Sequence, residues 1–211
     1  MAEEEEEEEE DKRKVVVPGE EIVSGDDYLP GDGTRKEGKK IIASRHGLAD
    51  VSDELIKIIP LSGGYLPRGG NVVIGQVEDV TYSGWRMDIK SPADAFLSVS
   101  ECPTYIKGDL TEYYDIGDML ACKVTNVKHG GVDLTIKGRN LGKLDEGLIM
   151  HINPNKVPRV IGKNGSMIKL IKGKTGCEIT VGQNGVVWIS GDSVEDELKA
   201  KDGILFVTKQ S

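Results

Sequence analysis

The sequence predicts an α+β multidomain chain: a small N-terminal β module, a five-stranded barrel and a mixed helix–sheet domain, preceded by an acidic tail. Glycine is abundant, at 27 of 211 residues, and aromatic residues make up only 5%. This composition favours several small, turn-rich modules over one large core. Short apolar segments with period-two alternation fill the first two thirds of the chain, and helical spacing begins only near residue 157.

Residues 1–14 form the predicted acidic tail. Residues 3–10 are eight glutamates and residue 11 is aspartate, so this run carries the whole formal charge of -9. A segment of this kind buries no apolar surface, and we expect it to be disordered. It could act as a solubilising tail or as an electrostatic docking segment. The remaining residues have no net charge, so an argument for nucleic-acid binding must rest on local sites.

Residues 15–66 read as short strands between turns. "VVVPGEEI" ends a strand at Pro18, glycine turns are expected at Gly31–Gly33 and near Gly38, and strands are expected at Lys40–Ser44 and within "DELIKIIPL". The segment contains no catalytic cluster. It is interpreted as a small β module whose role is packing and docking.

Residues 67–140 contain five predicted strands. Their ranges are Val72–Val80, Gly84–Ile89, Ala95–Val99, Met119–Val127 and Gly131–Ile136. In the second strand, Trp85, Met87 and Ile89 form one face. Arg86 and Asp88 form the other, which is the pattern of a half-buried strand. Five short strands in this length suit a partly open Greek-key barrel of OB type, a fold that binds single strands with a basic groove and stacking side chains.

Two pieces of this segment, "DAFLSVSE" (Asp94–Glu101) and "IGDMLACKV" (Ile116–Val124), resemble the RNA-binding domain first described in ribosomal protein S-one. The resemblance implies that the strand with the first aromatic residue and the loops at one barrel end face RNA. The implied candidates are Trp85, Arg86, Lys90, Lys107, Lys123, Lys128 and His129. Phe96 is read as core, and His129 could equally be a plain turn residue.

Residues 145–211 carry the strongest motif. The predicted order is strand ("GLIMHINP"), helix, helix, strand ("CEITVG"), strand ("VVWIS") and a final helix capped by Ser193 and Asp196. "VIGKNG" joins the first two helices. This order and the Gly-x-x-Gly loop resemble a type I KH domain.

The loop has a physical rationale. A tight turn between two helices presents free N–H groups and the positive end of the second helix, and glycines leave room for a phosphate backbone. A KH domain uses such a loop to clamp about four nucleotides. The predicted RNA contacts are Arg159, Ile161, Gly162, Lys163, Asn164 and Gly165, with Ile168 supporting the base groove. A glycine turn without a ligand is the alternative.

The three segments together resemble the archaeal exosome RNA-binding cap subunits, a family of RNA-degradation and ribosomal-RNA-processing factors. The first segment, with "GDGT" and "GKKIIASRHGLADV", distinguishes this family from other barrel and KH proteins. The resemblance implies that three copies cap a hexameric ring of phosphorolytic, RNase PH-type subunits. The N-terminal modules would dock on the ring, and the cap would thread the 3′ end of single-stranded RNA into it without catalysis of its own.

Other functions receive little support from the sequence. It contains no Walker lysine, nucleophile elbow or histidine cluster, and Cys102, Cys122 and Cys177 lack metal-ligand spacing. No cofactor is expected. A metal site at Asp88, Asp94 and Asp118 is possible, but exposed aspartates in strands and turns explain these residues more simply. No apolar run is long enough for a membrane span, and a cytoplasmic location is expected. A free-standing RNA-binding factor in translation or transcription is the alternative function.

Overall fold

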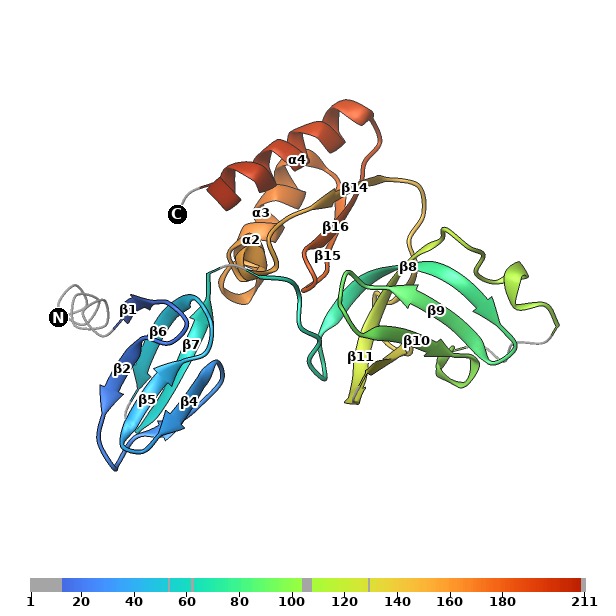
Figure 1. Cartoon of the computed structure of the whole chain (residues 1–211). Coiled ribbons are helices and arrows are strands. Elements are labelled where there is room, and N and C mark those ends of the chain that lie inside the picture. The colour runs from blue at the N-terminus through green and yellow to red at the C-terminus, as the bar shows by residue number, and fades with distance from the viewer. Residues whose placement is uncertain (1–12, 53, 62, 104–107, 129, 210–211) are drawn as a thin grey trace. The chain divides into compact units, whose positions relative to one another are not determined.

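A computed structural model describes residues 13–52, 54–61, 63–103, 108–128 and 130–209 (Figure 1). The chain divides into two compact units, Met1–Gly63 and Gly64–Ser211. The disorder predicted for the acidic tail falls on residues 1–12, which lie outside the described residues. Arg13 and Lys14, which we had assigned to the tail, belong to the first strand.

The first unit is built from short strands in two sheets. The strands are β1 (Arg13–Val16), β2 (Glu21–Ser24), β3 (Leu29–Pro30), β4 (Thr34–Glu37), β5 (Lys40–Ala43), β6 (Gly47–Ser52) and β7 (Leu55–Pro60). One sheet has the order β1-β6-β7-β3 and the other β2-β5-β4. Val16, Ala43, Ala49 and Ile58 form a buried core cluster. The predicted β module is confirmed.

The predicted strands at β5 and β7 are present, and buried residues alternate with more exposed ones along both. The strands β2, β3, β4 and β6 were not predicted from the sequence. The strand β4 is "TRKE", with no apolar residue, and β3 has two residues. A β turn in this unit is fixed by an ion pair between Arg45 and Asp32 at 2.7 Å.

The second unit begins with the barrel. Its strands are β8 (Val72–Thr81), β9 (Gly84–Asp88), β10 (Asp94–Ser98), β11 (Met119–Lys128) and β12 (Gly131–Thr135). The sheet order is β12-β10-β9-β8-β11, and a β11–β12 pairing closes it. A two-residue strand, β13 (Gly142–Lys143), adds to the edge of β11. The predicted five-stranded barrel is confirmed, and its strand ends differ from the prediction by one residue at most.

The chain continues into a three-stranded antiparallel sheet of order β14-β16-β15, covered by three helices (Figure 1). The elements are β14 (Leu148–His151), α2 (Val157–Ile161), α3 (Ser166–Thr175), β15 (Glu178–Val181), β16 (Val186–Ser190) and α4 (Val194–Lys209). Short 3₁₀ turns occupy Pro154–Lys156 and Lys163–Gly165. This is the predicted order of a KH domain, and it is confirmed.

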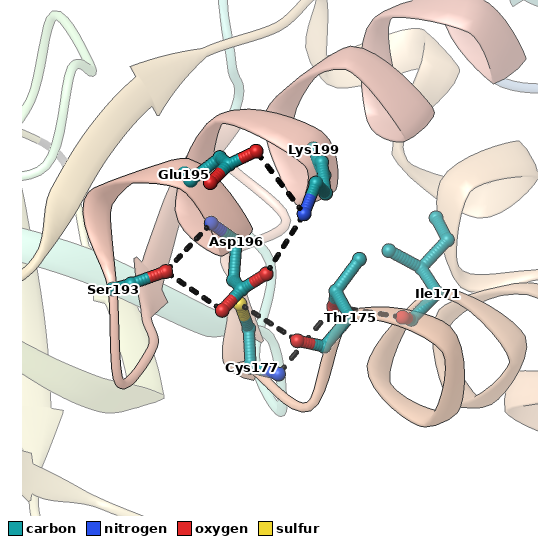
Figure 2. A network of polar contacts seen from close by, with 7 residues as sticks. All are labelled: Ile171, Thr175, Cys177, Ser193, Glu195, Asp196 and Lys199. Carbon is teal, nitrogen blue, oxygen red and sulfur yellow. Dashed lines mark hydrogen bonds and ion pairs between the residues drawn. The ribbon is translucent and has the colours of Figure 1, made fainter.

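The last helix begins as the sequence predicts. Ser193 Oγ accepts a hydrogen bond from the Asp196 N–H at 3.2 Å and bonds the Asp196 carboxylate at 2.7 Å (Figure 2). Lys199 pairs with Asp196 and with Glu195, so the first turn of α4 is tied together. The bond from the Asp196 N–H to Ser193 Oγ satisfies one of the free N–H groups of the helix start.

The barrel and the KH domain are joined by the β15–β16 hairpin. Asn184, at its turn, is only 4% exposed. Its side-chain amide donates to the carbonyl oxygens of Ile74 (2.8 Å) and Ile89 (2.9 Å), and its Oδ1 accepts from the Ile74 N–H at 3.3 Å. These bonds continue the β8–β9 ladder past its last pair, Gln76 and Asp88.

An apolar cluster lies beside this joint. Ile74 of the barrel packs with Val186 and Trp188 of the hairpin. The Gln183 N–H also donates to the Val72 carbonyl at 2.8 Å. The two domains therefore share both a core and a set of backbone hydrogen bonds, and their relative orientation is set by buried contacts.

Candidate nucleic-acid interface

The Gly-x-x-Gly loop joins α2 to α3 in a backbone conformation that requires glycine at one end. Gly162 has φ 74° and ψ 171°, a region that is essentially restricted to glycine. A Cβ placed on it would lie 2.8 Å from the Met167 nitrogen. Gly165 is left-handed, with φ 75°, but its Cβ would meet nothing closer than 3.8 Å. Gly162 is therefore needed for the turn, whereas Gly165 keeps the surface open.

The start of α3 is available to an anion. No side-chain hydrogen bond caps this helix. Lys163 and Asn164 are exposed at the loop, and Asn164 is also left-handed, with φ 54°. Uncapped N–H groups and the helix dipole together favour a phosphate at this position.

The charge on the two helices is one-sided. Residues 157–175 contain five basic side chains and no acidic one. These are Arg159, Lys163, Lys169, Lys172 and Lys174, and none of them has an ion-pair or hydrogen-bond partner among the described residues. The last three were missed by the motif-based prediction. Counting charge over the whole helix–loop–helix segment would have found them.

The basic candidates on the barrel differ in this respect. Arg86 pairs with Asp79 at 3.4 Å, Lys128 pairs with Asp133 at 2.6 Å, and Lys90 pairs with Asp88. Lys123 is exposed and has no partner within the described part of the chain. Lys107 and His129 lie outside the described residues. The barrel candidates that the structure describes are thus mostly neutralised by neighbours.

Trp85 is not a surface residue, which corrects the expectation that it stacks on RNA. Its side chain is completely buried, its Nε1 donates to the Tyr114 carbonyl at 2.8 Å, and its ring meets that of Tyr114 edge-on at 5.1 Å. The alternation that identified the strand also places Trp85 on the same inner face as Met87. Phe96, on the neighbouring strand, is half-buried.

A groove of about 600 Å3 runs along the KH domain beside the loop. Ile161 and Ile168, which the sequence analysis assigned to base binding, both line it, as do Lys172 and residues of β15. Residues 139–145, between the barrel and the KH domain, also line it. No pattern in the sequence predicts their part in the groove, because it depends on how the barrel and the KH domain pack.

Other site types find little support in the part of the chain that the structure describes. It has no cluster of three or more histidine, cysteine, aspartate or glutamate side chains that could hold a metal ion. The three cysteines are buried and unpaired. None of the described helices combines the length and apolarity needed to cross a membrane.

Comparisons with known proteins agree with this arrangement. The KH domain family matches residues 147–205, and the family described as the exosome RNA binding protein RRP4 N-terminal domain matches residues 13–62. A crystal structure described as an exosome complex RNA-binding protein is similar, with 34% identity and a TM-score of 0.63. The match covers 71% of this chain and 88% of that one.

Several curated archaeal proteins are similar over most of the chain. The exosome complex component Rrp4 of Methanothermobacter thermautotrophicus is 44% identical, over 88% of this chain and 60% of that protein. Its counterpart in Methanothermus fervidus is 45% identical, over 87% and 82%. In Pyrococcus furiosus the values are 41%, 93% and 76%. The chain thus spans about three fifths of the first relative's length and more of the other two. On these similarities, the chain belongs to the family of the exosome complex component Rrp4.

Proposed function

We propose that this chain is the RNA-binding cap subunit of an archaeal exosome in the cytoplasm. It captures single-stranded RNA and feeds the 3′ end into a phosphorolytic nuclease ring for degradation and processing. The observation that carries the proposal is the set of five cations on α2, α3 and the loop between them, which have no partner among the described residues and surround a loop with the geometry of a phosphate clamp.

The KH loop is the main RNA contact in this proposal. Backbone N–H groups at the start of α3 hold a phosphate, with Lys163 beside it and Gly162, Asn164 and Gly165 leaving access. Arg159 adds a second positive charge one turn earlier. Ile161 and Ile168 line the groove for the bases. Phosphate contacts supply affinity, and the apolar groove accepts bases of any sequence.

The barrel plays a secondary role. Arg86 and Lys128 must leave a carboxylate before they bind a phosphate. Exposed ion pairs are worth only about 0–1 kcal/mol, so this exchange is possible but reduces the gain. Lys123 can bind without such a loss. We therefore expect residues 67–140 to make weak contacts with the RNA and the KH domain to supply most of the RNA affinity.

Residues 15–66 dock on the ring. Val15 of β1 lies opposite Leu48 of β6, and Leu48 lies opposite Ile59 of β7, so the three side chains share one face of the sheet. Val15 is 53% exposed and Ile59 43%, and Val17 and Leu61, which follow β1 and β7 directly, are 53% and 46% exposed. We call these five residues the apolar row. A contiguous exposed apolar surface of this kind is typical of a protein–protein interface.

Catalysis belongs to the ring and not to this subunit. Three copies on a hexameric ring would present three KH loops to one RNA, so that weak single contacts add through effective concentration. The purified chain should bind RNA and leave it intact, with or without phosphate. RNA breakdown by the chain alone would refute this part of the proposal.

Two matched double variants test which domain binds RNA. Lys163→Asp with Asn164→Asp changes the loop by three charge units, and Asp is tolerated at the left-handed Asn164. Lys123→Asp with Asn126→Asp makes the same chemical change on exposed positions of β11. We expect the loop variant to bind single-stranded RNA about 10- to 100-fold more weakly, as for the loss of one or two charge-assisted hydrogen bonds. The barrel variant should lose less. The reverse order would assign binding to the barrel.

Docking is tested separately with Ile59→Asp. This variant should no longer co-purify with the nuclease ring but should keep its RNA affinity as a free chain. Val194→Asp is the control, because Val194 is also apolar and 71% exposed but lies on α4. A wild-type chain that never co-purifies with the ring would instead indicate a free-standing RNA-binding factor.

A further inference from the structure

The groove beside the KH loop has a wall that comes from outside the KH domain. Arg139, Asn140 and the residues that follow as far as Asp145 line it together with Ile161 and Ile168. This segment is the connection between the last barrel strand and β14. Its position in the groove makes it part of whatever the groove binds.

The connection is held in place from both sides. On the barrel side, Gly142 and Lys143 pair with Ala121 and Leu120 as β13. The Leu144 N–H donates to the Met119 carbonyl at 2.8 Å. On the KH side, the Asp145 carbonyl accepts from Trp188 Nε1 at 3.0 Å. A wall fixed by backbone pairing is already in place before a ligand arrives, so its ordering costs little on binding.

Lys143 and Arg139 have different roles in this wall. Lys143 forms an ion pair with Asp118 at 2.6 Å, so its charge is neutralised and helps to hold β13 in place. Arg139 is exposed and has no hydrogen-bond or ion-pair partner in the described ranges of the chain. Lys172 of α3, which also lines the groove, is likewise without a partner there. The groove thus has one available cation from the connecting segment and one from the KH domain.

The lining determines the class of ligand. Two cations without partners among the described residues, beside the apolar side chains of Ile161 and Ile168, fit a ligand that carries both phosphates and flat apolar groups, which a single-stranded nucleic acid does. The carboxylates of Asp145 and Glu178 also line the groove. They disfavour a phosphate deep inside but can accept hydrogen bonds from base amino groups. Bases therefore belong in the groove, with phosphates toward the loop and the exposed cations.

We propose that the connecting segment is a working part of the RNA site and that Arg139 contacts the RNA strand on the far side of the groove from the Gly-x-x-Gly loop. The proposal rests on the RNA-binding function argued above. It makes the site a composite of the KH domain and the barrel connection. An isolated KH domain would then lack one wall and one cation.

Arg139→Ala in the full chain tests this inference, with Lys201→Ala as the matched control. Lys201 lies on α4, does not line the groove and has no partner among the described residues. Affinity for a fluorescent single-stranded oligoadenylate is measured over a range of salt concentrations. We expect Arg139→Ala to bind about five-fold more weakly, with the slope of log K against log salt reduced by about 0.7, the value for one lost phosphate contact on a single strand. Lys201→Ala should behave as wild type.

The outcomes separate this inference from the proposed function. Wild-type affinity in Arg139→Ala, with binding lost in the Lys163→Asp, Asn164→Asp variant, would overturn the composite wall and leave the KH site standing. Equal losses in Arg139→Ala and Lys201→Ala would reduce Arg139 to general surface charge and also overturn it. No RNA binding by the wild-type chain would remove the proposed function itself. Because Arg139 makes no intramolecular polar contact in the described chain, its variant should keep the wild-type melting temperature.

Discussion

Replacing Asn184 with alanine should uncouple the barrel from the KH domain. The side chain makes three hydrogen bonds to barrel backbone at 2.8, 2.9 and 3.3 Å, and it is buried. The substitution leaves one N–H group and two carbonyl groups without these partners. An unsatisfied buried polar group costs roughly 1–3 kcal/mol, and water can reach some of the space vacated by the amide. We therefore expect a loss of about 3–5 kcal/mol in the free energy of unfolding.

Denaturant titration followed by tryptophan fluorescence measures this loss. Trp85 lies in the barrel core and Trp188 in the KH sheet, so the signal reports on both domains. The wild-type chain should show one transition for this unit, and Asn184→Ala should show two or a much broader one.

Asn155→Ala is the control for this experiment. Asn155 is exposed, and its side chain makes no hydrogen bond among the described residues, so its replacement should change stability by less than about 0.5 kcal/mol. A loss below about 1 kcal/mol in Asn184→Ala, with a single sharp transition, would refute the argument that this amide joins the domains.

Three further predictions concern the loop, the connection and the cysteines. Gly162→Ala should lower the free energy of unfolding by about 1–3 kcal/mol, since the φ and ψ angles of Gly162 are unfavourable for any residue with a side chain. Gly165→Asn should cost less than about 1 kcal/mol, because Asn tolerates the left-handed conformation. Thermal melts in which Gly165→Asn is the less stable variant would contradict the loop geometry. Burial raises the pKa of Asp118, but the hydrogen bond and charge of Lys143 and the hydrogen bond from the Asp115 N–H together outweigh it, so the pKa lies below the ordinary 3.8. The stability from this pair should be complete above pH 3.8 and lost as the pH falls through the lowered pKa, and Asp118→Asn should flatten that part of the stability–pH curve. Burial raises the pKa of Cys122 to about 12, and all three thiols are buried, so Ellman's reagent at pH 8 should label none of them until the chain unfolds.

The sequence predicted the barrel and the KH domain well because their cores are regular. Alternation along β8, β9 and β11 identifies strands without any knowledge of their partners. The N-terminal unit was predicted less completely. Its strand β4 contains only polar residues and is held by pairing with β5, which leaves no periodic apolar signal.

The site was predicted only as far as its motif. The Gly-x-x-Gly loop is local, so its residues could be named from the chain alone. Trp85 was assigned to the RNA-facing surface through the family resemblance, whereas the alternation of its own strand places it with Met87 on the inner face, where it packs against Tyr114. The bonds from Asn184 to Ile74 and Ile89 join segments about a hundred residues apart in sequence, so no local pattern predicts them. Contacts between domains do not produce a periodic pattern in the sequence, so they cannot be predicted from it.

The apolar row on β1, β6 and β7 also affects how readily a chain without a bound partner associates with another copy. A free chain with this surface exposed is prone to pair with another copy through it. In the sequence, eight glutamates and an aspartate at residues 3–11 are separated by Lys12 alone from Arg13, the first residue of β1. Two copies that approached through this face would bring two highly negative segments together, and their repulsion would keep the unassembled pool monomeric at low ionic strength. The acidic segment would then contribute to solubility most strongly when no partner covers the apolar row.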